Sequence, residues 1–240
     1  MVLVKKLAPE EIERHEKLIR ECFQKLIGEK SPEISLIDNG NNKGVYRVNG
    51  TRGNYLAAAA NRDSILGAQS LLEEYNILHR LYEGAPDFFP EPYAHYRSSK
   101  KEIKGDLILM EFLPHLNIMK FVQENNDLDR RRFAYLLGDA LTRVNSNTGR
   151  YPSDPHDGNI LLKKVGENLE LKFCDAIQFK TGSLEDGIRA ILVNSGERPE
   201  STRFIHKFRG GIINALESEG ISSKDAEQSL EFMREYNDIF

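Results

Sequence analysis

The hydrophobic pattern in the first quarter of the chain changes its period once. Between residues 9 and 27, apolar side chains recur every three or four positions, which is the spacing of an amphipathic helix with an acidic first turn. Residues 34–37, 44–48 and 54–57 are instead short apolar runs separated by turns rich in Asn and Gly. The pattern predicts one helix followed by an antiparallel meander of three strands.

A second helical pattern covers residues 65–82. It stops near Gly84 and Pro86, as a helix C-terminus should. Two further strands are predicted at residues 92–97 and 107–112, and a polar turn joins them. The first part of the chain therefore predicts a β-rich unit with one helix inserted between its strands.

The rest of the chain is mainly helical. Residues 117–124 and 131–144 have helical periodicity, and residues 151–179 read as a loop, a strand, a turn and a strand. The remaining C-terminal residues are helical with breaks. We therefore predict an α+β fold in two parts, residues 1–112 and residues 113–240, joined by a short hinge.

Composition and charge are those of an ordinary globular protein. The 240 residues are 40% hydrophobic and 29% charged, and the net charge of -4 gives no general attraction to nucleic acid or to an anionic membrane. The sequence has no signal-peptide pattern and no apolar run of about 18 residues, and its two cysteines lie far apart. We expect a cytoplasmic protein that binds neither membrane nor nucleic acid.

Two carboxylates and an amide stand out in the second part of the chain. Asp154 is followed five positions later by Asn159, which precedes an aliphatic strand, and Asp175 follows the next strand. Phosphoryl transfer needs a carboxylate near the attacking hydroxyl and oxygen ligands that hold Mg²⁺ against nucleotide phosphates. The three side chains can supply these groups. The competing interpretation is a polar loop that Asp and Asn merely cap.

This segment resembles the catalytic loop of the protein-kinase-like superfamily. Asp154, His156 and Asn159 match the D-x-H-x-x-N loop of its aminoglycoside and choline phosphotransferase branch. The resemblance implies that Asp154 is the catalytic carboxylate and that His156 lies near the transferred phosphate. It further implies that Asn159 and Asp175 are metal ligands, with ATP and Mg²⁺ as cofactors. The implied fold is bilobal: an antiparallel sheet with one helix in the N-lobe, and a mainly helical C-lobe.

Weaker resemblances occur elsewhere in the order that this superfamily requires. The segment that contains Gly40 and Gly44 is similar to the glycine-rich loop that covers the phosphates. Glu74 is similar to the glutamate of helix C, and residues around 111 are similar to the hinge. The resemblance implies that the backbone groups of Glu111 and Leu113 hold the adenine ring.

One required residue is missing. The superfamily places a phosphate-gripping lysine on the third strand, about sixteen positions before the helix-C glutamate, and here that position is Ala58. Lys43, in the glycine-rich loop, is the candidate replacement, because kinases that lack the strand lysine carry a relocated one there and its flexible stem can reach Glu74. Its competing interpretation is a solvated turn residue. Arg62 lies beyond the strand and Arg47 is expected to face away from the cleft, so both are poorer candidates.

Two further departures concern the loops. Pro152 stands where the superfamily usually has a scaffolding histidine, and Ala176-Ile177 stands where protein kinases have Phe-Gly. The second departure, with a short segment after Asp175, favours a small-molecule acceptor over a protein. Minimal protein kinases with such a short segment also exist, so the acceptor is predicted to be a hydroxyl-bearing small molecule or protein.

Two other functions fit parts of the sequence. The loss of the strand lysine at Ala58 favours a pseudokinase that binds nucleotide or a partner without catalysis. A PD-(D/E)xK nuclease would use Asp154 or Asp157 with Glu170 and Lys172, but an acidic chain without a basic stripe is unsuited to nucleic acid.

Overall fold

The structure is a computed structural model, and its elements are mixed α+β, with six described α-helices and a five-stranded antiparallel sheet. By internal packing the chain divides into two compact units, Met1–His79 with Pro90–Leu113 and Arg80–Phe89 with Pro114–Phe240. The residues described are 7–39, 43–61, 67–117, 121, 127–156, 158–195 and 201–233. None of the helices among them is both long and apolar enough to cross a membrane.

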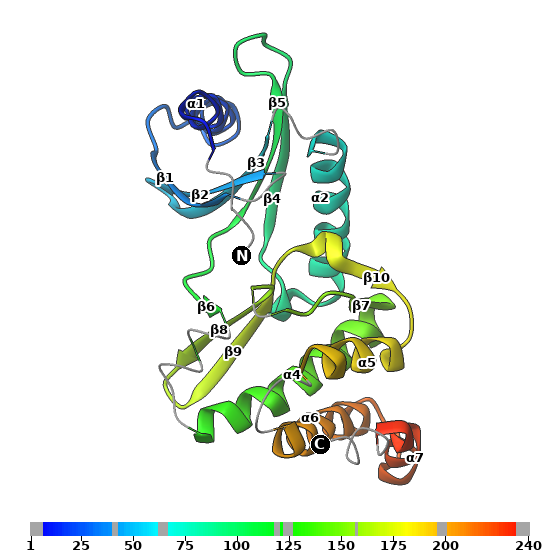
Figure 1. The fold of residues 1–240 in the computed structure, drawn as a ribbon. Coiled ribbons are helices and arrows are strands. Elements are labelled where there is room, and N and C mark those ends of the chain that lie inside the picture. The colour runs from blue at the N-terminus through cyan, green and yellow to red at the C-terminus, as the bar shows by residue number, and fades with distance from the viewer. Residues whose placement is uncertain are drawn as a thin grey trace. The chain divides into compact units, whose positions relative to one another are not determined.

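The first unit is built on a sheet with strand order β1-β2-β3-β5-β4, in which every neighbouring pair is antiparallel (Figure 1). The meander expected from the first three apolar runs is present, and the later strand pair completes the sheet. The strands are β1 (Glu33–Asn39), β2 (Lys43–Gly50), β3 (Gly53–Ala60), β4 (Pro92–Ser98) and β5 (Gly105–Glu111).

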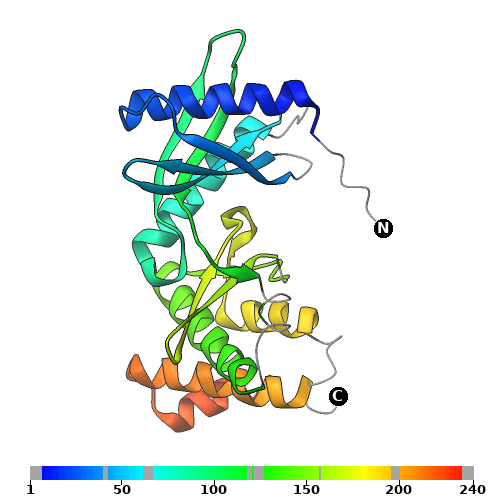
Figure 2. The same cartoon turned by 90° about the vertical axis from the view of Figure 1, so that its left-hand side faces the viewer.

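Two helices lie on opposite faces of this sheet (Figure 1). Helix α1 (Pro9–Leu26) runs across the strands, as Figure 2 shows, and its apolar side joins a core with inward residues of β2, β3 and β5. Helix α2 (Gly67–Gly84) lies on the other face. The division between the units falls inside α2, after His79.

The ends of α1 follow from local chemistry. Pro9 occupies the first helical position, where its missing N–H costs nothing, and Glu10 and Glu11 place negative charge at the positive end of the helix dipole. At the other end, Gly28 adopts φ +81° and its N–H donates to the carbonyl of Phe23. Glycine takes this left-handed conformation without the steric cost that other residues bear.

The second unit is mainly helical and contains two small sheets. One has the order β6-β8-β9, and the other pairs β7 with β10. Short 3-10 helices cover Pro86–Phe88, Ala176–Gln178 and Glu231–Met233. The other elements are β6 (Leu116–Asn117), α4 (Asp127–Thr148), β7 (Arg150–Pro152), β8 (Ile160–Val165), β9 (Asn168–Phe173), β10 (Phe179–Thr181), α5 (Leu184–Ser195), α6 (Ser201–Ser218) and α7 (Ser223–Ser229).

The structure differs from the sequence-based expectation in three places. Asn117 ends strand β6 instead of starting a helix, because it pairs with Leu161 across a ladder that local periodicity cannot reveal. Strands β7 and β10, which pair with each other, were not expected. The expected boundary after residue 112 lies one position before the chain leaves the first unit at Leu113, and residues 80–89 pack with the second unit.

Candidate active site

An ion pair joins Lys43 to Glu74 inside the first unit. The Lys43 Nζ lies 2.7 Å from both carboxylate oxygens of Glu74. The Glu74 side chain is 6% exposed and that of Lys43 is 26% exposed, so the pair is shielded on its acidic side. The expectation that Lys43 reaches Glu74 is confirmed, and the interpretation of Lys43 as a solvated turn residue is wrong. The role of Glu74 as a helix-C glutamate stays a prediction.

The strand register explains why a lysine at position 43 can serve this glutamate. Lys43 pairs directly with Ala60. Directly opposed residues of an antiparallel pair point to one face, as do residues two apart in a strand, so Lys43, Ala60 and Ala58 share a face. Ala59 is buried in the core beneath α1, on the other face. Lys43 and Ala58 therefore lie on the side where α2 carries Glu74.

The expectation that Arg47 points to the opposite face of the sheet from Val45 was wrong. Burial alternates along β2 so that Lys43, Val45 and Arg47 are half-buried on one face, while the intervening residues are buried under α1. The guanidinium of Arg47 lies 4.8 Å from the centre of the Phe112 ring, and its Nε donates to Asn49 Oδ1 at 2.8 Å. Arg47 is thus committed to contacts farther along the sheet. Gly40 and Arg62 lie outside the described residues.

The expected adenine-binding residues lie at the end of β5 and just after it. Glu111 is the last residue of β5 and pairs with Tyr55 of β3. Its N–H donates to the carbonyl of Glu91 at 2.8 Å, and its carboxylate accepts from the Glu91 N–H at 3.2 Å. Leu113 is buried and is the last residue of the first unit. The positions are well held, and their contact with adenine stays a prediction.

In the second unit, Asn159 ties the expected catalytic loop together. Its side-chain Nδ2 donates to the carbonyl of Asp154 at 3.0 Å, and its backbone N–H donates to the carbonyl of His156 at 2.9 Å. Its own carbonyl accepts from the N–H of Cys174, the residue before Asp175, at 2.9 Å. One residue therefore connects the loop to the second acidic turn.

His156 is oriented by the same loop. Its Nδ1 accepts a hydrogen bond from the Gly158 N–H at 2.9 Å, so the neutral ring carries its proton on Nε2. A Cβ on Gly158 would lie 2.8 Å from His156 Cε1, which explains why a glycine stands there. His156 and Asp154 are both exposed, and Asp157 lies outside the described residues.

Asp175 occupies a strained backbone position. Its φ and ψ are both 62°, and no other described non-glycine residue has a positive φ. Left-handed backbone in a residue other than glycine costs about 1–2 kcal/mol and persists only where surrounding structure imposes it. The Asp175 carbonyl accepts from the Gln178 N–H at 3.1 Å, which closes the turn.

Two strand pairs hold this turn beside the loop. Ile160 of β8 pairs with Phe173 of β9, directly after Asn159 and two residues before Asp175. Pro152 of β7 pairs with Phe179 of β10, directly before the loop and after the turn. These two ladders bring Asp154, His156, Asn159 and Asp175 into one neighbourhood.

Ser153 is a site residue that sequence reasoning missed. Its backbone N–H and its hydroxyl both donate to the carbonyl of Gln178, at 2.9 and 2.7 Å. Three phenylalanine rings, Phe89, Phe173 and Phe179, lie with centroids 5.1 to 5.8 Å apart next to the same strand ends. The β7–β10 ladder, which includes Pro152, and this aromatic cluster hold the loop. No local pattern signals either feature.

The donor set fits magnesium better than a transition metal. Among the described residues, no group of three or more His, Cys, Asp or Glu side chains is placed to hold a metal ion. Asn159 and Asp175 offer one amide oxygen and one carboxylate. Mg²⁺ is usually bound by one or two protein carboxylates, with phosphate oxygens and water completing its octahedron.

Lys172, the lysine that the nuclease interpretation needs, is engaged in other contacts. Lys172 Nζ donates to the carbonyls of Pro86 and Phe89 at 3.0 and 2.9 Å, so it fastens the segment after α2. Glu170 is half-exposed and lies 3.7 Å from Lys163. Neither side chain is directed to a shared metal site by these contacts.

The candidate residues thus form two groups, the Lys43–Glu74 pair in the first unit and the Asp154–Asn159–Asp175 cluster in the second. Searches with models of known protein families and against curated proteins give no match to this chain. Its membership of the protein-kinase-like superfamily is therefore a proposal.

Proposed function

We propose that this protein is a kinase-like phosphotransferase that moves the γ-phosphoryl group of ATP to a hydroxyl group. The observation that carries the proposal is the shielded Lys43–Glu74 pair on the face of the sheet where position 58 lacks a lysine. A chain without nucleotide chemistry would have no physical need for the Lys43 ammonium on the face of the sheet that carries Ala58.

The architecture supports the same proposal. The first unit has an antiparallel sheet with α2 on one face, and the second is helical with small strand pairs. We infer that they are the N-lobe and C-lobe of a bilobal kinase-like fold. Helix α1 on the opposite face of the sheet is an addition to that plan.

Each residue then has a defined task. The Lys43 ammonium binds phosphate oxygens, and Glu74 holds it in place. Asn159 and Asp175 would hold Mg²⁺, which when bound would offset the negative charge of the phosphates. The strain at Asp175 fits a ligand whose position matters more than local stability.

Asp154 is assigned to the acceptor hydroxyl. The acceptor oxygen forms a bond to the γ-phosphorus while the bond from that phosphorus to the ADP oxygen breaks, and Asp154 takes the hydroxyl proton. Exposure leaves its carboxylate open to an acceptor, while its backbone is held by Asn159. His156 Nε2–H is available as a donor to the transferred phosphate.

The decisive experiment measures Mg²⁺-dependent ATP binding by titration calorimetry. Asp175→Gly removes the carboxylate and fits the left-handed backbone without strain, so the variant should fold. We expect Mg²⁺-dependent affinity to disappear in this variant and to persist in Asp87→Ala, an exposed aspartate of the same unit. Unchanged affinity in Asp175→Gly would remove this residue from the site.

Asp154→Ala separates an enzyme from a pseudokinase. It should keep ATP affinity and lose transfer to the acceptor, because Asp154 acts on the hydroxyl and not on the nucleotide. Slow ATP hydrolysis serves as the readout until an acceptor is known, with water as acceptor. If the unaltered protein binds Mg²⁺–ATP but does not hydrolyse ATP, the pseudokinase would be favoured.

A further inference from the structure

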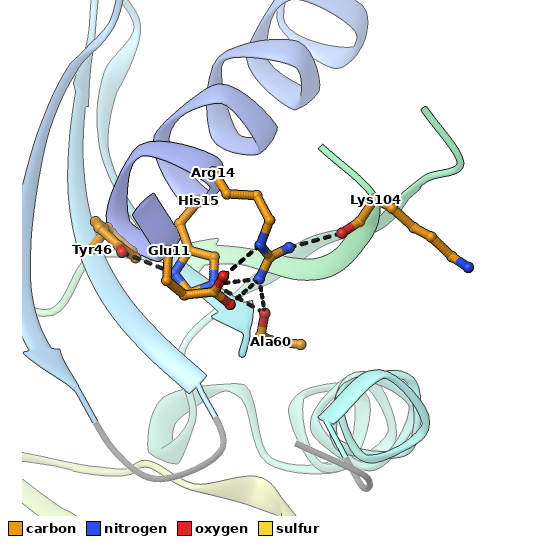
Figure 3. Close-up of polar contacts among 6 residues, drawn as sticks. All are labelled: Glu11, Arg14, His15, Tyr46, Ala60 and Lys104. Atoms are coloured by element: carbon orange, nitrogen blue, oxygen red, sulfur yellow. Dashed lines mark hydrogen bonds and ion pairs between the residues drawn. The ribbon is translucent and has the colours of Figure 1, made fainter. Parts of the chain in front are cut away.

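A buried polar cluster on α1 is not used by the proposed chemistry. Arg14 and His15 are 4% and 0% exposed (Figure 3). The Arg14 guanidinium binds the carboxylate of Glu11 through Nε and Nη2, and it donates to the carbonyls of Lys104 at 2.8 Å and Ala60 at 2.6 Å. Burying a charged guanidinium costs desolvation free energy, so a buried arginine with this many hydrogen bonds is expected to have a role in the structure.

His15 completes the cluster as a neutral ring. Burial, with Arg14 beside it, lowers the pKa of His15 to about 4. Its Nε2 lies 2.8 Å from Arg14 Nη2 and 3.0 Å from the Ala60 carbonyl oxygen, and its Nδ1 lies 2.9 Å from the Tyr46 hydroxyl. His15 thereby links α1 to β2.

The Arg14–His15 cluster contacts the sheet at Ala60, the residue that pairs directly with Lys43. Ala60, whose carbonyl Arg14 binds, is the last residue of β3 and is the direct partner of Lys43, the first residue of β2. Next to Lys43, a Cβ on Gly44 would lie 3.0 Å from His15 Nδ1 and from a ring carbon of Tyr46. Helix α1 therefore contacts this strand end through a carbonyl, a glycine backbone and a hydroxyl.

We propose that Arg14 and His15 are positioning residues that hold the end of the β2–β3 ladder so that the Lys43 ammonium stays on Glu74. The inference deepens the proposed function, because it names what orients the relocated lysine. A terminal ladder pair is the part of a sheet that opens most easily, since it has neighbours on one side only. A lysine on a central strand is held by ladders on both sides, whereas Lys43 begins its strand.

The same helix provides a matched control. Glu21 is also buried and binds the Ser98 hydroxyl at 2.8 Å, with Lys25 and Lys100 as ion-pair partners. This second cluster fastens α1 to the end of β4, away from Lys43. If the Arg14 cluster only attaches the helix, disrupting either cluster should affect Lys43 equally.

The test measures the reactivity of Lys43 in the 240-residue protein without nucleotide. Reductive methylation of the folded protein, read by mass spectrometry, reports how often each ammonium leaves its partner, with exposed Lys17 as the internal standard. Loss of a hydrogen bond at the ladder end should speed Lys43 modification about threefold to tenfold in Arg14→Met and less in Tyr46→Phe. Glu21→Gln should leave the rate unchanged.

Equal Lys43 rates in all variants, or equal acceleration in Glu21→Gln, would overturn the proposal. Tyr46→Phe removes only a hydroxyl, so it decides the matter if Arg14→Met does not fold. Mg²⁺–ATP titration gives the separate functional readout. Suppose that the variants speed Lys43 modification but Lys43→Ala leaves ATP affinity unchanged. The positioning role of Arg14 and His15 would then stand, and the role of Lys43 in phosphate binding would be refuted.

Discussion

A lysine can serve the same carboxylate from either of two paired strands when both positions share one face of the sheet. Position 58 and Lys43 meet this condition, since Lys43 opposes Ala60 and Ala60 follows Ala58 by two residues. Ala58 is 2% exposed, so the site keeps a small apolar residue where a long cation would otherwise lie. In this chain the cation that pairs with Glu74 is on β2 and not on β3.

Removing Lys43 should therefore weaken ATP binding and transfer. A charge-assisted hydrogen bond to phosphate contributes roughly 2–3 kcal/mol, so Lys43→Ala should lose about 30- to 150-fold. Adding Ala58→Lys to that variant should restore part of the loss, because the new ammonium is on the same face. The measurement is ATP affinity by calorimetry, with Lys17→Ala as the exposed-lysine control. Failure of the double variant to recover, while it folds, would show that the two positions are not equivalent.

At the scale of elements, α4 and α6 pack at van der Waals distance through glycines. A Cβ on Gly211 would lie 1.9 Å from the Tyr135 carbonyl oxygen, and one on Gly138 would lie 2.2 Å from the Phe208 carbonyl oxygen. Backbone atoms cannot yield as a flexible side chain can. These two glycines therefore set the distance between the helices that support the second unit.

Gly211→Ala should destabilise the protein by about 3 kcal/mol or more, because the helices must separate to admit the methyl group. The adjacent Gly210 is the control: a Cβ there meets its nearest atom at 3.8 Å. Gly210→Ala should gain up to about 1 kcal/mol from helix propensity. Urea unfolding monitored by circular dichroism compares the two. Equal effects of the two substitutions would contradict the close-contact explanation.

For the whole molecule, His15 gives unfolding a defined pH dependence. Its folded pKa of about 4 lies below the ordinary 6.5, so the unfolded chain binds the proton more tightly. Stability is complete above pH 6.5 and is lost as the pH falls towards 4. The groups that face the ring are Arg14 and Glu11 from its own helix and Tyr46 from β2.

Lowering the pH from 7 to 4.5 should cost the natural protein about 2–3 kcal/mol through His15 alone. His15→Gln keeps a polar side chain and should lose that part of the pH dependence. Burial also lowers the pKa of His95, but this group is present in both proteins and cancels in the comparison. Urea titrations at the two pH values give the difference. The same loss in both proteins would show that His15 does not titrate as described.

Much of the fold was predictable where neighbours along the chain decide it. The helix expected at residues 9–27 is α1 (Pro9–Leu26), and the strands expected at 92–97 and 107–112 are β4 (Pro92–Ser98) and β5 (Gly105–Glu111). Strands β6 and β10 were not predictable, because each has only two or three residues and exists through its partner.

The sequence by itself determined the order of the longer helices and strands and the α+β class, because periodicity and turns act within a few residues. The resemblance left open whether Lys43 meets Glu74 or is a solvated turn residue, and tertiary structure decided for the contact. Tertiary structure alone decided that Ser153 binds Gln178. It also decided that α1 reaches the Lys43–Ala60 pair. These contacts join residues 25 or more positions apart. They depend on strand register and on which face of the sheet each helix covers, which no local pattern encodes.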